Sequence, residues 1–269
     1  MSRFDWHRHR QGLVIGLIAG IGGGLVSLGG GTLVIPMLMS WAGMNPLAAR
    51  GTALAVSLFT ASVASLTYAA HGMLDIRVVL WVAVPALLIT PLAAAGSERW
   101  PAARLRAGFG AVVVMGGLLV IFRDIATVGA TIPATLQVPY LLAVGIVEGL
   151  VAGVIGISGG PVLAPLFVLG LGMPQQLAQG CSLLARLPAV LSGTWENLRL
   201  GNVQRALVPS LALGAVLGAY SGSKIALALP EHGLRIIFGI LLVALGLHYL
   251  HASRHPHKPL PVSEWKPSR

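Results

Sequence analysis

A glycine-rich turn followed by a proline occurs twice in this chain, at residues 29–36 (GGGTLVIP) and at residues 158–165 (SGGPVLAP). The two copies are 129 residues apart, and the same offset brings many other positions into register without a gap. The matched pairs include Gly16 and Gly145, Gly20 and Gly149, Gly24 and Gly153, Gly43 and Gly172, Gly51 and Gly180, Gly72 and Gly201, Arg106 and Arg235, and Gly110 and Gly239. Because chance apolar composition would not keep these residues in step, the sequence predicts two copies of one unit.

The amino-acid composition indicates whether these units fold in water or in a lipid bilayer. Hydrophobic residues make up 55% of the 269 residues, charged residues make up 10%, and the mean hydropathy is +0.83. These values lie far from those of soluble proteins. Four apolar runs, at 51–70, 78–95, 105–122 and 234–249, are near or above the length that a helix needs to cross a bilayer. The sequence therefore predicts an all-α polytopic membrane protein whose surroundings are the lipid bilayer.

The formal net charge of +10 does not indicate nucleic-acid binding. The basic residues lie mainly in the two tails and in short loops, as they do on the cytoplasmic side of membrane proteins. The single cysteine, Cys181, excludes an intramolecular disulfide and a cysteine-based zinc site, and most histidines lie toward the chain ends. We therefore expect no nucleic-acid partner, no cofactor and no metal.

The first apolar block, residues 12–43, is too long to be one membrane helix. It would span about 48 Å, whereas the hydrocarbon core is about 30 Å thick, and three consecutive glycines interrupt it. The sequence predicts two half-length helices, 13–26 and 32–41, with counterparts at 140–155 and 161–169. Each unit therefore has four segments and begins with a broken helix or a re-entrant hairpin.

Charge distribution favours the re-entrant hairpin. With a cytoplasmic N-terminus, a returning hairpin places more Lys and Arg residues on the cytoplasmic side than a crossing pair does. A returning hairpin followed by three crossings also inverts the second repeat, which is a transporter architecture. The crossing alternative stays open at this stage.

This interpretation divides the chain into five parts and places it in the cell (inner) membrane with both termini cytoplasmic. The parts are an N-terminal tail (1–11), a first repeat (12–123), a connecting loop (124–138), a second repeat (139–251) and a basic C-terminal tail (252–269).

The two glycine-rich turns are the first candidate site. Glycine lets a ligand approach backbone N–H groups, and a helix that begins there adds unpaired donors and the positive end of its dipole. Both features favour an anion. The residues that we expect to bind substrate are Gly30, Gly31, Thr32, Ser158, Gly159 and Gly160. Gly16, Gly20 and Gly24 are instead expected to serve close helix packing.

Arg186 is the one basic residue well inside an apolar span. An arginine there is costly unless it is paired or solvated, so it is a functional candidate. The alternative is a structural ion pair with Glu148, the only acidic residue deep in an apolar stretch. Nearby hydroxyl and thiol groups could complete a shell of ligands around the anion, at Thr52, Cys181 and Ser182. Four further residues could serve coupling or gating, namely Arg50, Glu148, Gln179 and Asn197. Tyr68 and Asn197 lie near span ends and are expected at the interface.

The order of these motifs resembles that of a known family. The duplicated glycine turn and proline, Arg50-Gly51-Thr52-Ala53-Leu54 and Gln179-Gly180-Cys181-Ser182-Leu183, and the closing Leu234-Arg235-Ile236-Ile237-Phe238-Gly239 resemble the TauE/SafE sulfite exporter family over roughly residues 12 to 250. Cys181 stands where threonine is usual in that family, and Arg186-Leu187-Pro188 is unusual for it.

The resemblance implies a membrane permease for sulfite, organosulfonates or related small anions, with no enzymatic step. Export is the expected direction, and a homodimer is one option for the oligomeric state. Two alternatives remain. One is a cation- or proton-coupled carrier of another small solute, because carbonyl groups at broken helices can hold cations. The other is a rhomboid-like serine protease, because Gly156-Ile157-Ser158-Gly159 matches a Gly-x-Ser-Gly motif and His248 could act as a base.

Overall fold

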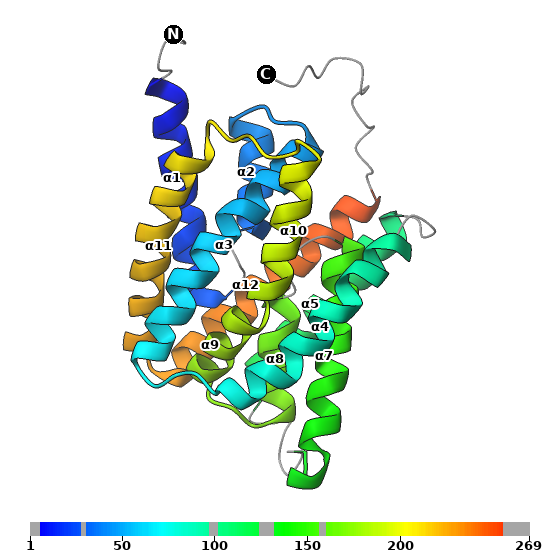
Figure 1. Ribbon diagram of the computed structural model, residues 1–269. Coiled ribbons are helices and arrows are strands. Elements are labelled where there is room, and N and C mark those ends of the chain that lie inside the picture. Colours follow the sequence, from blue (N-terminus) through cyan, green and yellow to red (C-terminus); the bar gives the residue numbers. More distant parts are fainter. Residues whose placement is uncertain (1–5, 28–30, 97–101, 124–131, 156–159, 255–269) are drawn as a thin grey trace.

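The computed structural model describes residues 6–27, 31–96, 102–123, 132–155 and 160–254, and all regular structure in these residues is helical (Figure 1). The helices are α1 (Trp6–Val26), α2 (Gly31–Trp41), α3 (Pro46–Ala70), α4 (Ile76–Gly96), α5 (Ala102–Ile121), the short 3-10 helix η2 (Ala134–Leu136), α7 (Gln137–Ile155), α8 (Gly160–Gly170), α9 (Gln175–Ala185), α10 (Leu187–Arg199), α11 (Val208–Ala228) and α12 (Glu231–Arg254). Five of the described helices are long and apolar enough to cross a membrane. The predicted all-α membrane fold is thus confirmed.

Both predicted helix breaks are present. α1 ends at Val26 and α2 begins at Gly31, while α7 ends at Ile155 and α8 begins at Gly160. α2 and α8 have 11 residues each, about half the length needed to cross a bilayer. The start of α1 differs from the prediction, because the helix begins at Trp6 and includes part of the predicted tail; residues 6–11 contain no glycine or proline to stop it.

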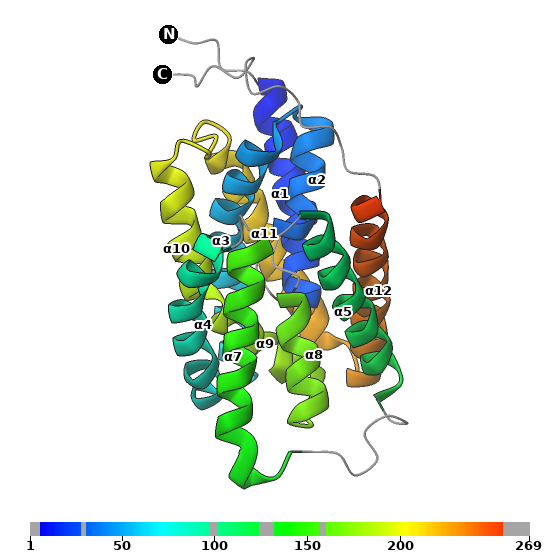
Figure 2. The same cartoon turned by 90° about the vertical axis from the view of Figure 1, so that its right-hand side faces the viewer.

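Each broken pair forms a hairpin that returns to the end of the bundle at which it began. Figure 1 shows α1 beginning and α2 ending at one end of the molecule. Figure 2 shows α7 beginning and α8 ending at the opposite end. We call the first end the α1 end and the second the α9 end, because α9 begins there. The relation of the two repeats across a bilayer stays a prediction.

The helix boundaries keep the 129-residue offset. Adding 129 to the residue numbers of α2 gives the range of α8, and adding 129 to those of α3 gives the combined range of α9 and α10. The most extensive contacts join α1 to α11, α5 to α12 and α4 to α7. Under the same offset α1 corresponds to α7, and α4 corresponds to α11. If each broken pair counts as one segment, the first helix of each unit therefore packs on the third segment of the other, which ties the two units together.

Glycines allow the closest of these pairs to form. A Cβ atom at Gly16, Gly20 or Gly24 of α1 would collide with a backbone carbonyl oxygen of α11, at Leu211, Ala215 or Ala219 respectively. The reverse holds for Gly214, Gly218 and Gly222 of α11, which face backbone carbonyls of α1. This confirms the predicted packing role of Gly16, Gly20 and Gly24, because only glycine lets the two backbones approach so closely.

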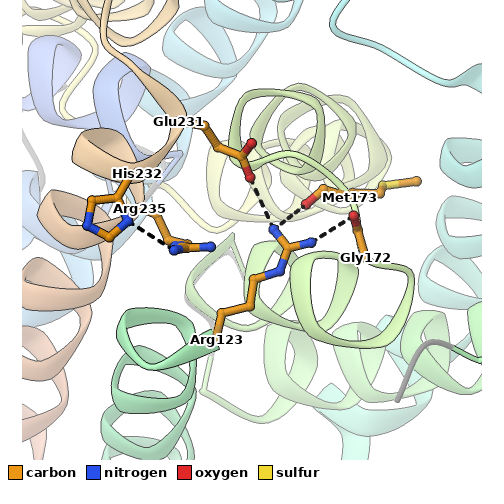
Figure 3. Close-up of polar contacts among 6 residues, drawn as sticks. All are labelled: Arg123, Gly172, Met173, Glu231, His232 and Arg235. Atoms are coloured by element: carbon orange, nitrogen blue, oxygen red, sulfur yellow. Dashed lines mark hydrogen bonds and ion pairs between the residues drawn. The ribbon is translucent and has the colours of Figure 1, made fainter. Parts of the chain in front are cut away.

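Polar contacts join three segments at the α9 end (Figure 3). Arg123, just after α5, donates from Nη2 to the carbonyl oxygen of Gly172 at 2.8 Å and from Nη1 to that of Met173 at 3.3 Å. The same Nη1 lies 3.1 Å from Oε1 of Glu231, the first residue of α12. The loop between α8 and α9 is therefore fixed to the ends of α5 and α12.

The packing of α1 on α11 can be tested with a matched pair of glycine substitutions. Gly20→Leu should destabilise the protein by about 3 kcal/mol, because the added side chain collides with backbone that cannot move aside. Gly108→Leu on α5 should have little effect, because a Cβ at Gly108 meets nothing within 4 Å. Thermal unfolding in detergent, followed by size-exclusion chromatography, measures both; equal stability of the two variants would contradict the packing.

Candidate functional site

The two helix breaks meet inside the bundle. Ser27 follows α1, is fully buried and has a positive φ of 45°. Its carbonyl oxygen accepts a hydrogen bond of 2.8 Å from Nη1 of Arg186. A Cβ atom at Gly160, the first residue of α8, would collide with both the Ser27 carbonyl oxygen and Arg186 Nη1. The end of α1, the start of α8 and the guanidinium of Arg186 are therefore in direct contact, and position 160 has room only for glycine.

Arg186 occupies a third helix break. Its backbone (φ −86°, ψ −13°) connects α9 to α10, and Pro188 follows in the first turn of α10. Proline has no N–H and clashes with the preceding turn, which explains why the continuous α3 of the first repeat is divided here. The equivalent of Pro188 in α3 is Phe59, and the equivalent of Arg186 is Ser57. The break and the charge therefore belong to the second repeat alone.

The Arg186 side chain is only partly satisfied. It is 0% exposed, and its Nε and Nη2 atoms have no hydrogen-bond partner among the described residues. The Glu148 carboxylate on α7, also 0% exposed, attracts the guanidinium electrostatically. This attraction agrees with the predicted pairing of the two charges. Because the N–H groups of these two buried nitrogen atoms have no acceptor in the described part of the chain, the arginine retains capacity to bind one.

A small polar cluster surrounds the contact between Ser27 and Arg186. Ser182 Oγ donates to Ser27 Oγ at 3.1 Å and lies 3.0 Å from the Gln179 carbonyl oxygen. The Tyr68 hydroxyl lies 2.7 Å from Gln179 Oε1 and 3.1 Å from the Gly24 carbonyl oxygen. Tyr68, Gln179 and Ser182 are all 0% exposed. The cluster therefore joins α1, α3 and α9 around the break.

The electrostatics of this region favour an anion. α8 begins at the contact, so the positive end of its dipole and the N–H groups of its first turn, which have no partner within the helix itself, lie there. The positive charge of Arg186 lies beside that end. The carbonyl at the end of α1 would oppose an anion, but it already accepts from Arg186 Nη1. Donors at a helix start together with a partly satisfied guanidinium form the kind of environment in which proteins bind oxyanions.

Thr52 and Cys181, expected as substrate ligands, lie elsewhere. The Thr52 hydroxyl accepts a hydrogen bond of 3.0 Å from the backbone N–H of Gln204. Cys181 Sγ accepts one of 3.3 Å from the backbone N–H of Asp75. The two contacts are equivalent under the 129-residue offset, and each holds the loop that precedes the third segment of the other unit, α11 for Thr52 and α4 for Cys181. Both side chains therefore have a structural partner outside the Arg186 cluster.

The remaining predicted residues divide into three groups. Gln179 and Ser182 join the Arg186 cluster, and Gly160 and Glu148 contact or attract the guanidinium. Asn197 lies at the end of α10, where Nδ2 donates to the Gly193 carbonyl at 2.8 Å, and Arg50 lies half-buried in α3. Gly31 is the first residue of α2 and Thr32 the second; Gly30, Ser158 and Gly159 lie outside the described residues.

Sequence reasoning missed three members of the cluster. Tyr68, expected at the interface, is fully buried, because the α9 end of α3 packs against α9. Ser27 and Gly24 contribute carbonyl oxygens, for which a sequence carries no direct signal. The break at Arg186 could have been found, since Pro188 interrupts an apolar segment whose counterpart has Phe59 at the equivalent position.

Comparison with known proteins connects this arrangement to transport. The family model described as sulfite exporter TauE/SafE matches residues 2–120 and 141–269. The "Probable membrane transporter protein YunE" of Bacillus subtilis (strain 168) is 24% identical over 264 residues, covering 89% of this chain and 96% of the relative. The "Probable membrane transporter protein y4hK" of Sinorhizobium fredii (strain NBRC 101917 / NGR234) is 29% identical over 219 residues, covering 79% and 86%.

A third relative, the "Probable membrane transporter protein" of Xylella fastidiosa (strain 9a5c), is 27% identical over 245 residues, covering 87% of this chain and 92% of the relative. No solved structure matches the chain significantly. The family model covers nearly the whole chain and both repeats, which agrees with the resemblance found in the sequence motifs. The chain therefore belongs to the TauE/SafE sulfite exporter family of membrane transporters.

Proposed function

We propose that this transporter moves a small sulfur-containing anion, such as sulfite or an organosulfonate, across the inner membrane and out of the cell. The anion binds where the two helix breaks meet, between the start of α8 and the guanidinium of Arg186. Gly160 supplies close access to the backbone, and Arg186 supplies the counter-charge. The turn residues Gly30, Ser158 and Gly159, which lie outside the described residues, are candidates for the rest of the anion shell together with Gly31 and Thr32.

One observation supports this proposal above the others: beside a helix start, the fully buried Arg186 has two nitrogen atoms, Nε and Nη2, that find no hydrogen-bond partner among the described residues. Desolvating a guanidinium and leaving N–H groups unpaired costs several kcal/mol, so such groups are retained where a ligand satisfies them. A sulfite or sulfonate group offers several oxygens to the fork of a guanidinium, which suits two-point hydrogen bonding.

The site is closed in this conformation, since Ser27, Tyr68, Gln179, Ser182 and Arg186 are all 0% exposed. Transport therefore requires the packing around the site to open toward each face in turn. We propose that the two repeats are inverted in the membrane and that they rock against one another around the site, as in other transporters built from inverted repeats.

Two other functions make different predictions. A cation- or proton-coupled carrier would use the buried Glu148 as its binding group, and it would show cation flux without any sulfur anion. A serine protease would require Ser158 as a nucleophile, with His248 of α12 as its base, and it would react with a fluorophosphonate at Ser158. Each of these results would replace the anion proposal.

The role of Arg186 can be tested in proteoliposomes loaded with sulfite, sulfoacetate, thiosulfate or taurine. Arg186→Gln should lower the flux of the transported anion by about 100-fold, the loss expected from removing a buried charge-assisted contact. Arg186→Lys should retain part of the flux, because lysine keeps the positive charge but cannot donate two parallel hydrogen bonds as a guanidinium does. The matched control is Arg199→Gln, since Arg199 is exposed and lies over the Trp195 ring.

Loss of folding is separated from loss of binding by a second variant. Arg186→Gln combined with Glu148→Gln removes both buried charges, so no unpaired carboxylate is left behind. This double variant should elute as a folded protein and remain inactive. Normal flux in a folded protein without Arg186 would remove the residue from the site.

The orientation in the membrane can be tested by cysteine labelling in a Cys181→Thr background. Leu47 is 61% exposed near the start of α3, and Ala70 is exposed at its end. With a cytoplasmic N-terminus, Leu47→Cys should resist an impermeant thiol reagent in intact cells and react after permeabilisation. Ala70→Cys should react in intact cells. Rapid labelling of Leu47→Cys from outside would contradict the proposed orientation.

A further inference from the structure

α9 carries a buried polar stripe that leads to Arg186. Gln175, Gln179, Ser182 and Arg186 are spaced 4, 3 and 4 residues apart, so they lie on one face of the helix within about 60° of one another. All four are 0% exposed. Gln175 is the first residue of α9, at the α9 end of the bundle, and Arg186 follows its last residue. The polar stripe therefore runs the whole length of α9.

Three amide atoms of this stripe lack partners in the part of the chain that the structure describes. They are Nε2 and Oε1 of Gln175 and Nε2 of Gln179. A buried amide without a partner costs free energy comparable to a lost hydrogen bond. Three unpartnered amide atoms in an apolar helix bundle are therefore unfavourable. Water or a passing solute would satisfy these atoms.

The opposite face of α9 has the character expected of packing. Leu177 and Leu184 lie on that face and pack, partly buried, against the apolar core around Phe167.

The first repeat also lacks the stripe. The positions equivalent to Gln175, Gln179, Ser182 and Arg186 are Pro46, Arg50, Ala53 and Ser57. Ser57 Oγ is satisfied locally by the Ala53 carbonyl oxygen at 2.7 Å. The shared scaffold therefore does not require the polar stripe.

We infer that the polar stripe of α9 is the lining of a half-path between the α9 end and the Arg186 site. This inference rests on the proposed function and adds the route and the preferred charge of the solute. Neutral amides can replace water around an oxyanion without holding it tightly, and the Arg186 guanidinium lies at the inner end with Nε and Nη2 unpartnered among the described residues. This lining suits a small anion rather than a cation.

The mouth of the half-path is closed by contacts already described. The loop at Gly172 and Met173 directly precedes α9 and is held by Arg123, which also pairs with Glu231 (Figure 3). Further in, the Tyr68 hydroxyl and Gln179 Oε1 are 2.7 Å apart across the path. Opening toward the α9 end requires the loop to leave Arg123 and Tyr68 to leave Gln179.

Thiol labelling tests the half-path without relying on transport. In a Cys181→Thr background, Gln175→Cys and Gln179→Cys are compared with Leu177→Cys and Leu184→Cys on the opposite face of α9. The probe is the impermeant sulfonate anion methanethiosulfonate ethylsulfonate, added from the α9 end. The two glutamine positions should react at least tenfold faster than the two leucine positions. Equal or slower labelling at the glutamine positions would overturn the half-path.

A stability measurement covers the case in which a cysteine variant misfolds. Gln175→Leu removes an unpartnered amide, so it should raise the thermal midpoint while lowering flux by tenfold or more. A fall in the thermal midpoint would show that the Gln175 amide is structural and would overturn the proposal.

The charge preference separates this inference from the proposed function. The labelling rate of Gln179→Cys by the anionic reagent is divided by the rate of a cationic reagent of similar size, and the ratio is normalised to that of Ala70→Cys. Adding Arg186→Gln should lower the ratio by about fivefold or more, because the buried guanidinium at the inner end is lost. Fast labelling with an unchanged ratio would keep the half-path and overturn the anion site.

Discussion

The structure depends on how irregular backbone and a positive charge are stabilised inside an apolar bundle. In a bilayer, broken helices persist only where protein or a watery cavity satisfies the freed polar groups. Here the break after α1 is satisfied by Arg186, whose Nη1 donates to the Ser27 carbonyl oxygen at 2.8 Å. The same contact fixes the guanidinium against Gly160 at the start of α8. One side chain therefore joins the two hairpins and places a positive charge where they meet.

The glycine pattern and the polar pattern serve different purposes in the two repeats. The glycines that recur at the 129-residue offset allow helices to approach one another, as Gly16 and Gly20 do on α11. The proposed site residues differ between the repeats, because Arg186 corresponds to Ser57 and Gln179 to Arg50. In the proposed account, the shared glycines serve the scaffold and the differences in the second copy serve the site. Thr52 and Cys181 are a useful contrast, since they differ in type but keep the same structural contact.

Much of the fold could be predicted from the sequence. Both helix breaks were predicted to within one residue of Gly31 and Gly160, because glycine and proline act locally on the backbone. The polar cluster could not be predicted in full. Tyr68 and Gln179 are 111 residues apart, and their contact depends on how α3 packs against α9. Ser27 contributes a carbonyl oxygen, which every residue has, so only the fold distinguishes it.

The central claim is that an oxyanion binds Arg186 where the two hairpins meet. Selenite and methaneselenonate resemble sulfite and methanesulfonate in shape and charge, and selenium can be located by its anomalous scattering. Crystals of the intact transporter soaked in either compound should show one strong selenium peak within hydrogen-bonding distance of Arg186 Nε or Nη2 and next to Gly160. Selenium peaks elsewhere in the bundle, with none beside Arg186, would contradict the account.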